Sequence, residues 1–68
     1  MVGKYRLTKE TLGIVIATHL AESVPKGSII EIRTAPLPGD RTVVVFSNGQ
    51  PMVMFVRDLT ERANKVHE

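Results

Sequence analysis

The feature that most limits how this chain can fold is an Asn48-Gly49 pair between two runs of β-branched and aromatic residues, 41–47 and 50–57. Asn-Gly favours a two-residue type I′ turn, because both turn positions need a positive φ. A turn of that type also sets the register of the flanking strands, so that Ser47 faces Gln50 and the pairing continues outward from there. The pattern therefore predicts a long antiparallel hairpin.

Both faces of this predicted hairpin are apolar. Alternation along the strands separates a valine–methionine face, made of Val43, Val45, Met52 and Met54, from a phenylalanine face, made of Val44, Phe46, Val53 and Phe55. A sheet with one wetted face would alternate apolar with polar residues, so we expect both faces to be covered. We assign the phenylalanine face to the core. The valine–methionine face is then the candidate association surface, because methionine suits adaptable contacts.

The segment before the hairpin predicts a strand and a loop. Residues 28–34 place Ile30 and Ile32 on one side and charged residues on the other, which is typical of a strand with one wetted face. Residues 35–40 contain two prolines and a glycine, which cannot sustain a ladder of backbone hydrogen bonds. We expect a loop there.

The segment after the hairpin predicts a short helical turn over residues 58–65. Asp58 can cap this turn, and Glu61 stands three residues later as its capping-box partner. The tail, residues 64–67, is predicted to add a last short strand.

Residues 5–24 fit two patterns, and both stay open at this point. A helix over residues 9–23 would be capped by Thr8 and would carry a broad apolar arc. That alternative gives an α+β fold, with an N-terminal helix packed on a three-stranded antiparallel sheet. The other pattern is two strands joined by a bend near Thr18-His19. Gly13 and the β-branched residues after it disfavour the helix.

The order of these elements carries a resemblance. Its two motifs are Pro25-x-Gly27-Ser28 before an apolar strand and Met54-Phe55-x-x-Asp58-Leu59-x-x-Arg62 after the hairpin. Over residues 5–66 this order resembles a group of short, uncharacterised bacterial proteins and the small five-stranded barrels of the Src-homology-3 type. The chain differs from that group at residues 17–23, where a glycine-containing turn is expected and Ala17-Thr18-His19-Leu20 stands instead. The resemblance implies an all-β, five-stranded Src-homology-3-like barrel with one short helical turn near the C-terminus, and no particular activity.

Composition limits the possible functions further. The chain has 68 residues, 43% apolar and 24% charged, which is typical of one folded domain, residues 1–68. Cysteine is absent, which excludes disulfides, zinc–thiolate sites and thiol catalysis. Small chains that lack disulfides and metal sites often gain stability by binding a partner. No signal-peptide pattern and no apolar run near ~20 residues occurs, so we expect a cytoplasmic protein with no membrane segment.

The charge distribution supports an alternative function only weakly. The nine basic residues are interleaved with seven acidic ones, for a net charge of +2, which favours an ordinary solvated surface. A small barrel can still bind nucleic acid through exposed aromatic and basic side chains. The candidate contacts for a nucleic-acid-binding accessory protein are Lys4, Tyr5, Arg6, Arg33, Arg41 and Arg57.

Catalytic motifs are not evident. The sequence contains no phosphate-binding loop, dinucleotide fingerprint, nucleophile elbow or zinc-binding helix motif. His19 and His67 do not have the spacing of metal ligands, so we expect neither a metal nor a cofactor. No small-molecule substrate is indicated. We therefore expect a non-enzymatic interaction module, either a homodimer or a subunit that docks on a larger protein.

Overall fold

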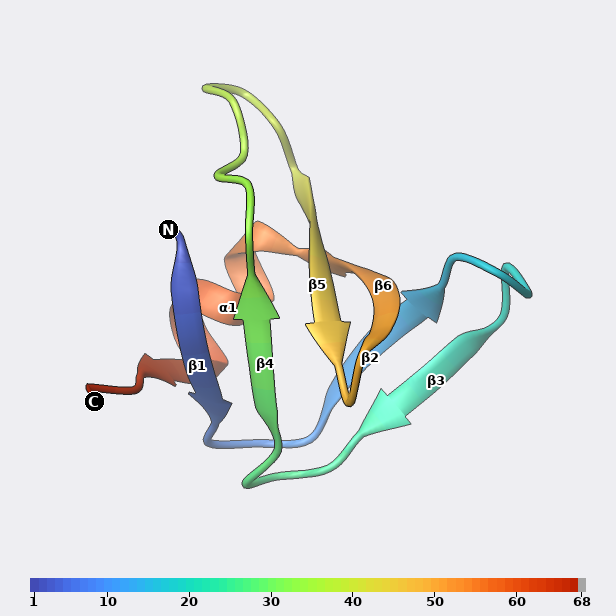
Figure 1. Cartoon of the computed structure of the whole chain (residues 1–68), viewed down its shortest axis with the longest axis horizontal. Helices are drawn as coiled ribbons and strands as arrows, with labels where there is room; N and C mark the ends of the chain where they lie inside the picture. Colours follow the sequence, from blue (N-terminus) through green and yellow to red (C-terminus); the bar gives the residue numbers. More distant parts are fainter. Residues whose placement is uncertain (68) are drawn as a thin grey trace.

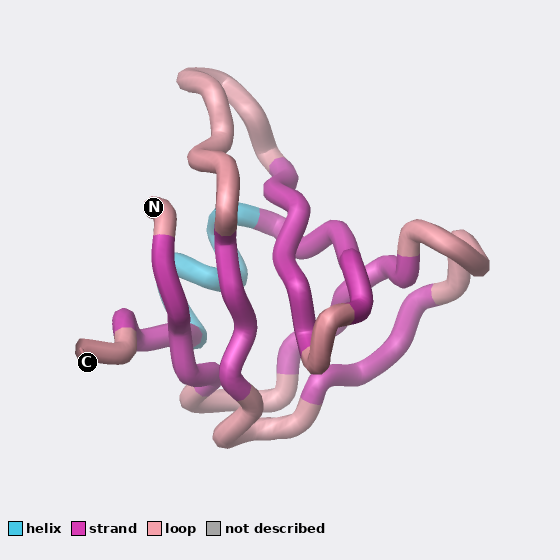
Figure 2. The backbone as a smooth tube through the Cα atoms, viewed as in Figure 1, coloured by secondary structure: helices cyan, strands magenta, loops and turns pink. Residues whose placement is uncertain are grey.

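One antiparallel sheet of seven strands accounts for about half of the chain (Figure 1). The computed structural model describes residues 1–67. The elements in chain order are β1 (Gly3–Leu7), β2 (Thr11–Val15), β3 (Ala21–Val24), β4 (Ile29–Ile32), β5 (Thr42–Ser47), β6 (Gln50–Phe55), α1 (Val56–Arg62) and β7 (Ala63–Lys65). Figure 2 shows helix in one short segment and strand in most of the rest. The predicted all-β class is confirmed.

The sheet is open, with the strand order β3-β2-β6-β5-β4-β1-β7. Its edges are β3 and β7, and no pairing joins them within residues 1–67. The five strands expected from the sequence are therefore seven, and a closed barrel is not confirmed. Both edges are short: β7 has three residues, and β3 stops at Pro25, which has no N–H to extend a ladder.

The hairpin predicted from Asn48-Gly49 is confirmed in position and register. β5 and β6 pair from Ser47 and Gln50 at the turn to Thr42 and Phe55 at the far end. Asn48 has φ of 51° and Gly49 has φ of 78°, as a type I′ turn requires.

Residues 11–24 form a hairpin of β2 and β3, so the alternative of a helix over residues 9–23 is wrong. Gly13 explains why the strand is preferred. Its Cα faces the core, and a Cβ built there would lie 2.8 Å from Cε of Met52, so the strand passes close over the methionines. The turn needs no glycine, because His19 adopts φ of 58° and donates its N–H to the Val15 carbonyl at 2.8 Å.

The helical turn is present, although not as predicted. α1 starts at Val56, its N-cap is Phe55, and no side chain caps it. Asp58 lies in the first turn instead, where a negative charge interacts favourably with the helix dipole. Glu61 accepts a hydrogen bond from Arg57 Nε at 3.5 Å rather than completing a capping box. The last strand, β7, begins one residue before the predicted tail.

The core lies on one side of the bent sheet. It consists of buried apolar side chains from six strands and the helix: Leu7, Val15, Val24, Ile30, Ile32, Val43, Val45, Met52, Met54 and Leu59. The predicted association surface, Val43, Val45, Met52 and Met54, is part of this core, with exposures of 0–6%. That assignment is wrong because β1, β2, β4 and α1 supply the apolar partners on this side of the hairpin, and no layer forms on the other side within the described residues.

Candidate functional site

The side of the sheet opposite the core carries a broad apolar surface. Its central row is defined by strand register, which places Ile14 between Ala21 of β3 and Val53 of β6, and Val53 beside Val44 of β5. Four of its large side chains are strongly exposed: Leu12 at 61%, Ile14 at 42%, Val44 at 43% and Phe55 at 53%. The phenylalanine face, predicted as core, is therefore the outer side of the hairpin.

This surface has a defined extent. We call it the outer apolar face, made of the outward side chains of β3, β2, β6 and β5 and the adjoining Ile16: Leu12, Ile14, Ile16, Ala21, Ser23, Thr42, Val44, Phe46, Pro51, Val53 and Phe55. Within these described strands no outward position is charged. Four adjoining strands therefore present one continuous surface without a formal charge.

The β2–β3 hairpin extends this face. Its far end reaches beyond the other strands (Figure 1). Ile16, just after β2, is 40% exposed, and Leu20, just before β3, is 65% exposed. Sequence reasoning missed this contribution. The available signal was the alternation of Thr11 and Gly13 with Leu12 and Ile14, which puts small residues against the core and large apolar residues outward.

The outer apolar face ends at Phe46, where charged residues begin. Arg33 places its guanidinium carbon 3.9 Å from the centroid of the Phe46 ring. The same side chain forms an ion pair with Glu31, at 2.7 Å between Nε and Oε1. Glu31 is paired with Phe46 across β4 and β5, and with Lys4 across β4 and β1. The outer side of β4 and β1 therefore carries both acidic and basic side chains, as solvent-exposed protein surfaces usually do.

The six candidate nucleic-acid contacts do not form one patch. Lys4 and Arg6 project from the outer side of β1, whereas Tyr5 points inward and packs against the core, so its ring is no platform for a base. Arg33 covers Phe46.

The remaining two arginines do come together, around Phe55. Arg41 and Arg57 line a depression with Phe55 and Val56, and Val56 donates its N–H to the Arg41 carbonyl at 2.9 Å. Arg57 is largely exposed, with its side chain 86% accessible. Asp40 lines the same depression. This group of an exposed aromatic residue and two arginines is the one arrangement within residues 1–67 that retains part of the nucleic-acid prediction.

The described residues contain no grouping of three side chains that could hold a metal ion. His19 lies in the β2–β3 turn and His67 follows β7, at opposite edges of the sheet order. Every buried polar side-chain atom in residues 1–67 has a hydrogen-bond partner. No helix in this part of the chain is long and apolar enough to cross a lipid bilayer.

Comparison of the chain with models of protein families, with curated proteins and with solved structures finds no match. The functional argument therefore depends on the surfaces described above.

Proposed function

We propose that this protein is a non-enzymatic interaction module that self-associates as a twofold dimer through the outer apolar face. The observation that carries the proposal is the uninterrupted, uncharged surface of exposed large side chains across β3, β2, β6 and β5. Contiguous apolar surfaces of this kind mark interaction sites on folded proteins.

The size of the face suits a dimer. The exposed fractions of its five strongly exposed large residues and of Leu20 together amount to about three fully exposed side chains. Burying that much apolar surface stabilises by roughly 5–9 kcal/mol for each copy, and so by roughly 10–18 kcal/mol for a dimer. Association costs about 4–15 kcal/mol in lost freedom, so covering the face on both copies can offset this cost. A standard interface removes about 800 Å² from each partner, and the chain exposes 4730 Å². About one sixth of the surface is needed, which four adjoining strands can provide.

The absence of charge favours a second copy as the partner. In a twofold interface each residue lies near its own counterpart or near a fixed second residue, so a charge close to the axis meets a like charge. Like charges placed opposite one another are destabilising. The outer apolar face has no charged residue at its outward positions in the described strands, so two copies can meet without this repulsion.

We also propose that the fold of this chain is related to the small barrels of the Src-homology-3 type. Support comes from the order in which the central hairpin of β5 and β6 is followed by one helical turn and a last short strand. A sheet of this type hosts many unrelated functions, so the relationship adds no activity to the module.

Sedimentation equilibrium of the wild type and two matched variants tests the dimer. Ile14→Glu puts a charge in the centre of the outer apolar face, where Ile14 is 42% exposed. Ile29→Glu makes the same change on the charged half of the same side of the sheet, where Ile29 is 39% exposed. We expect twice the 7.5 kDa chain mass for the wild type and for Ile29→Glu. Ile14→Glu should be monomeric, with at least about tenfold weaker association.

Two results would contradict the proposal. One is a wild-type protein that stays monomeric at several hundred micromolar. The other is equal weakening of the dimer by both variants, because that would assign the interface to no particular half of the sheet.

A nucleic-acid-binding role is the second candidate, and Phe55 with its two arginines is the observation that favours it. Neither a hydrogen bond nor an ion pair within residues 1–67 holds the Arg41 side chain, so it is available to a phosphate. Titration with single-stranded oligonucleotides at two salt concentrations tests this role. Binding that weakens steeply with salt and is lost in Arg41→Ala supports it. No binding at low salt removes it.

A further inference from the structure

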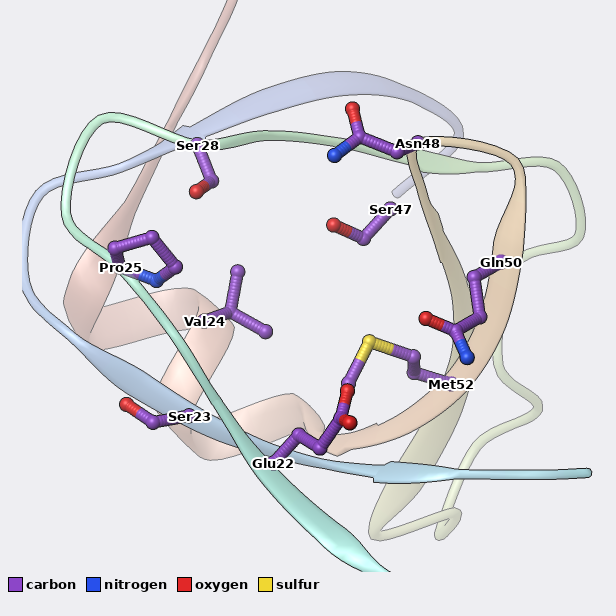
Figure 3. Close-up of a pocket in the computed structure, with 9 residues that line it drawn as sticks. All are labelled: Glu22, Ser23, Val24, Pro25, Ser28, Ser47, Asn48, Gln50 and Met52. Carbon is purple, nitrogen blue, oxygen red and sulfur yellow. The ribbon is translucent and has the colours of Figure 1, made fainter. Parts of the chain in front are cut away.

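A small cavity opens beside the core, where the β3–β4 connection meets the β5–β6 turn (Figure 3). Its volume is about 260 Å³. The lining residues come from two separate segments of the chain, residues 22–28 and residues 47–52. This volume lies below the roughly 300–1,000 Å³ of pockets for drug-sized ligands, so the cavity suits one small group.

The floor of the cavity is apolar. Val24 is 5% exposed and Met52 is 2% exposed, and both belong to the core. Pro25 adds a further apolar ring at one side (Figure 3). A short hydrocarbon stem can therefore pack against this apolar floor.

The walls are polar, and their hydrogen-bonding groups are unused. Ser28, Ser47, Asn48 and Gln50 surround the opening (Figure 3). None of these side chains makes a hydrogen bond to another group of the chain within residues 1–67. Together they provide two hydroxyl oxygens and two amide oxygens as acceptors around one small space.

The only charged residue that lines the cavity is Glu22. It is paired with Gly13 across β2 and β3, and because Gly13 faces the core, Glu22 lies on the same side of the ribbon as the cavity. Its carboxylate has no ion-pair partner within residues 1–67. No lysine or arginine lines the opening to compete for it.

We propose that this cavity binds an alkylammonium or alkylguanidinium group. The hydrocarbon stem packs on Val24 and Met52, and the cationic head donates hydrogen bonds to the carboxylate of Glu22 and to the amide oxygen of Gln50. Both a cation and an alcohol can donate a hydrogen bond to the Glu22 carboxylate, but the cation alone also forms an ion pair with it, so Glu22 favours a cation over a neutral alcohol. The ligand is either a free small amine or a lysine or arginine side chain of a protein.

Apart from Ser23 of the edge strand β3, the cavity lining shares no residue with the outer apolar face. Ala21 and Ser23 project outward from β3 next to Ile14 and Leu12, whereas Glu22 projects to the opposite side. A change at Glu22 should therefore leave the dimer mass unchanged, and the two proposals can fail independently.

Amide-resolved NMR titration of the whole chain tests the cavity. The probes are butylammonium, butylguanidinium, neutral butanol and the tripeptides Gly-Lys-Gly and Gly-Arg-Gly. We expect saturable shifts confined to residues 22–28 and 47–52 for the cations, with dissociation constants of about millimolar. Butanol, which cannot form the ion pair, should bind about two- to fivefold more weakly. Tighter binding of the tripeptides than of the free cations identifies a protein side chain as the ligand, and the reverse identifies a small amine.

Glu22→Gln keeps the shape of the side chain and removes its charge, and Glu10→Gln is the matched control at an exposed residue that lines no part of the cavity. Because Glu22 is exposed, we expect Glu22→Gln to weaken cation binding about two- to fivefold and Glu10→Gln to leave it unchanged. Any of three results overturns the proposal: no saturable shift, shifts spread over the whole surface, or equal affinity in the two variants.

Discussion

The valine–methionine face and the phenylalanine face of the β5–β6 hairpin meet opposite environments, although each carries four large apolar side chains. On the first, Val45 is 0% exposed, and on the second its neighbour Val44 is 43% exposed. The first face is closed by side chains from other strands and from α1. The second has no covering layer within residues 1–67.

This difference shows that the position of a strand pair in the sheet decides which apolar side becomes core. Both faces have the same tendency to leave water, at about 25 cal/mol per Å². Residues 1–67 cover one of the two, because α1 is a seven-residue helix and lies on the inner side through Leu59. A second copy can supply the missing layer.

The largest expected effect comes from placing the same charged residue on each of the two faces. Val45→Asp buries a carboxylate with no partner, and since that costs about 4 kcal/mol or more, we expect the chain to be unfolded. Val44→Asp places the same group on the outer apolar face. It should remain folded, within about 1 kcal/mol of the wild type in dilute solution, and lose the dimer.

Far-UV circular dichroism, urea unfolding and sedimentation of the two variants check this prediction. The assignment of inside and outside fails if Val45→Asp folds normally. It fails equally if Val44→Asp unfolds the chain at concentrations where the wild type is monomeric.

A smaller effect concerns how closely β2 approaches the inner face. A Cβ at Gly13 would lie 2.8 Å from Met52 Cε and 3.3 Å from Met54 Cε. These buried side chains must shift, so we expect Gly13→Ala to destabilise the chain by about 1–3 kcal/mol. Met52→Leu shortens one of the two neighbours and should recover part of that loss.

Urea unfolding of the wild type, both single variants and the double variant gives the coupling energy. Additive effects would mean that Gly13 and Met52 do not contact one another, which contradicts the packing described for β2 and β6.

The sequence was sufficient for the hairpin because turn chemistry is local. Asn48-Gly49 determines both the turn type and the register of β5 and β6, and both are as predicted. Residues 28–34 also behave as expected, with Ile30 and Ile32 in the core and Glu31 on the opposite side of β4.

The candidate surface could not be assigned correctly, because burial is not local. Alternation separates the two faces of β5 and β6 but contains no information on which face β1, β4 and α1 will cover. The presence of two phenylalanines suggested core, whereas the other strands and α1 cover the methionine side, where Gly13 packs closely over Met52 and Met54. The candidate binding cavity is harder still to predict, since its residues come from two segments, 22–28 and 47–52, that meet only in the folded chain.

The smallest expected effect concerns the border of the outer apolar face. Arg33 covers Phe46 and pairs with Glu31, while its own side chain stays 60% exposed. An exposed cation–π contact contributes about 0.5–1 kcal/mol, so Arg33→Ala should lower the monomer's unfolding free energy by that amount. The same change uncovers Phe46 beside Val44 and enlarges the apolar face. We therefore expect association to tighten by about two- to fivefold.

Sedimentation and urea unfolding of Arg33→Ala measure both effects, with Arg6→Ala as a control on the charged half of the sheet. Opposite signs for stability and association would show that Arg33 limits the dimer surface. Weaker association in Arg33→Ala would place Arg33 inside the interface, and the border between the apolar and charged halves would then lie at β4 rather than at Phe46.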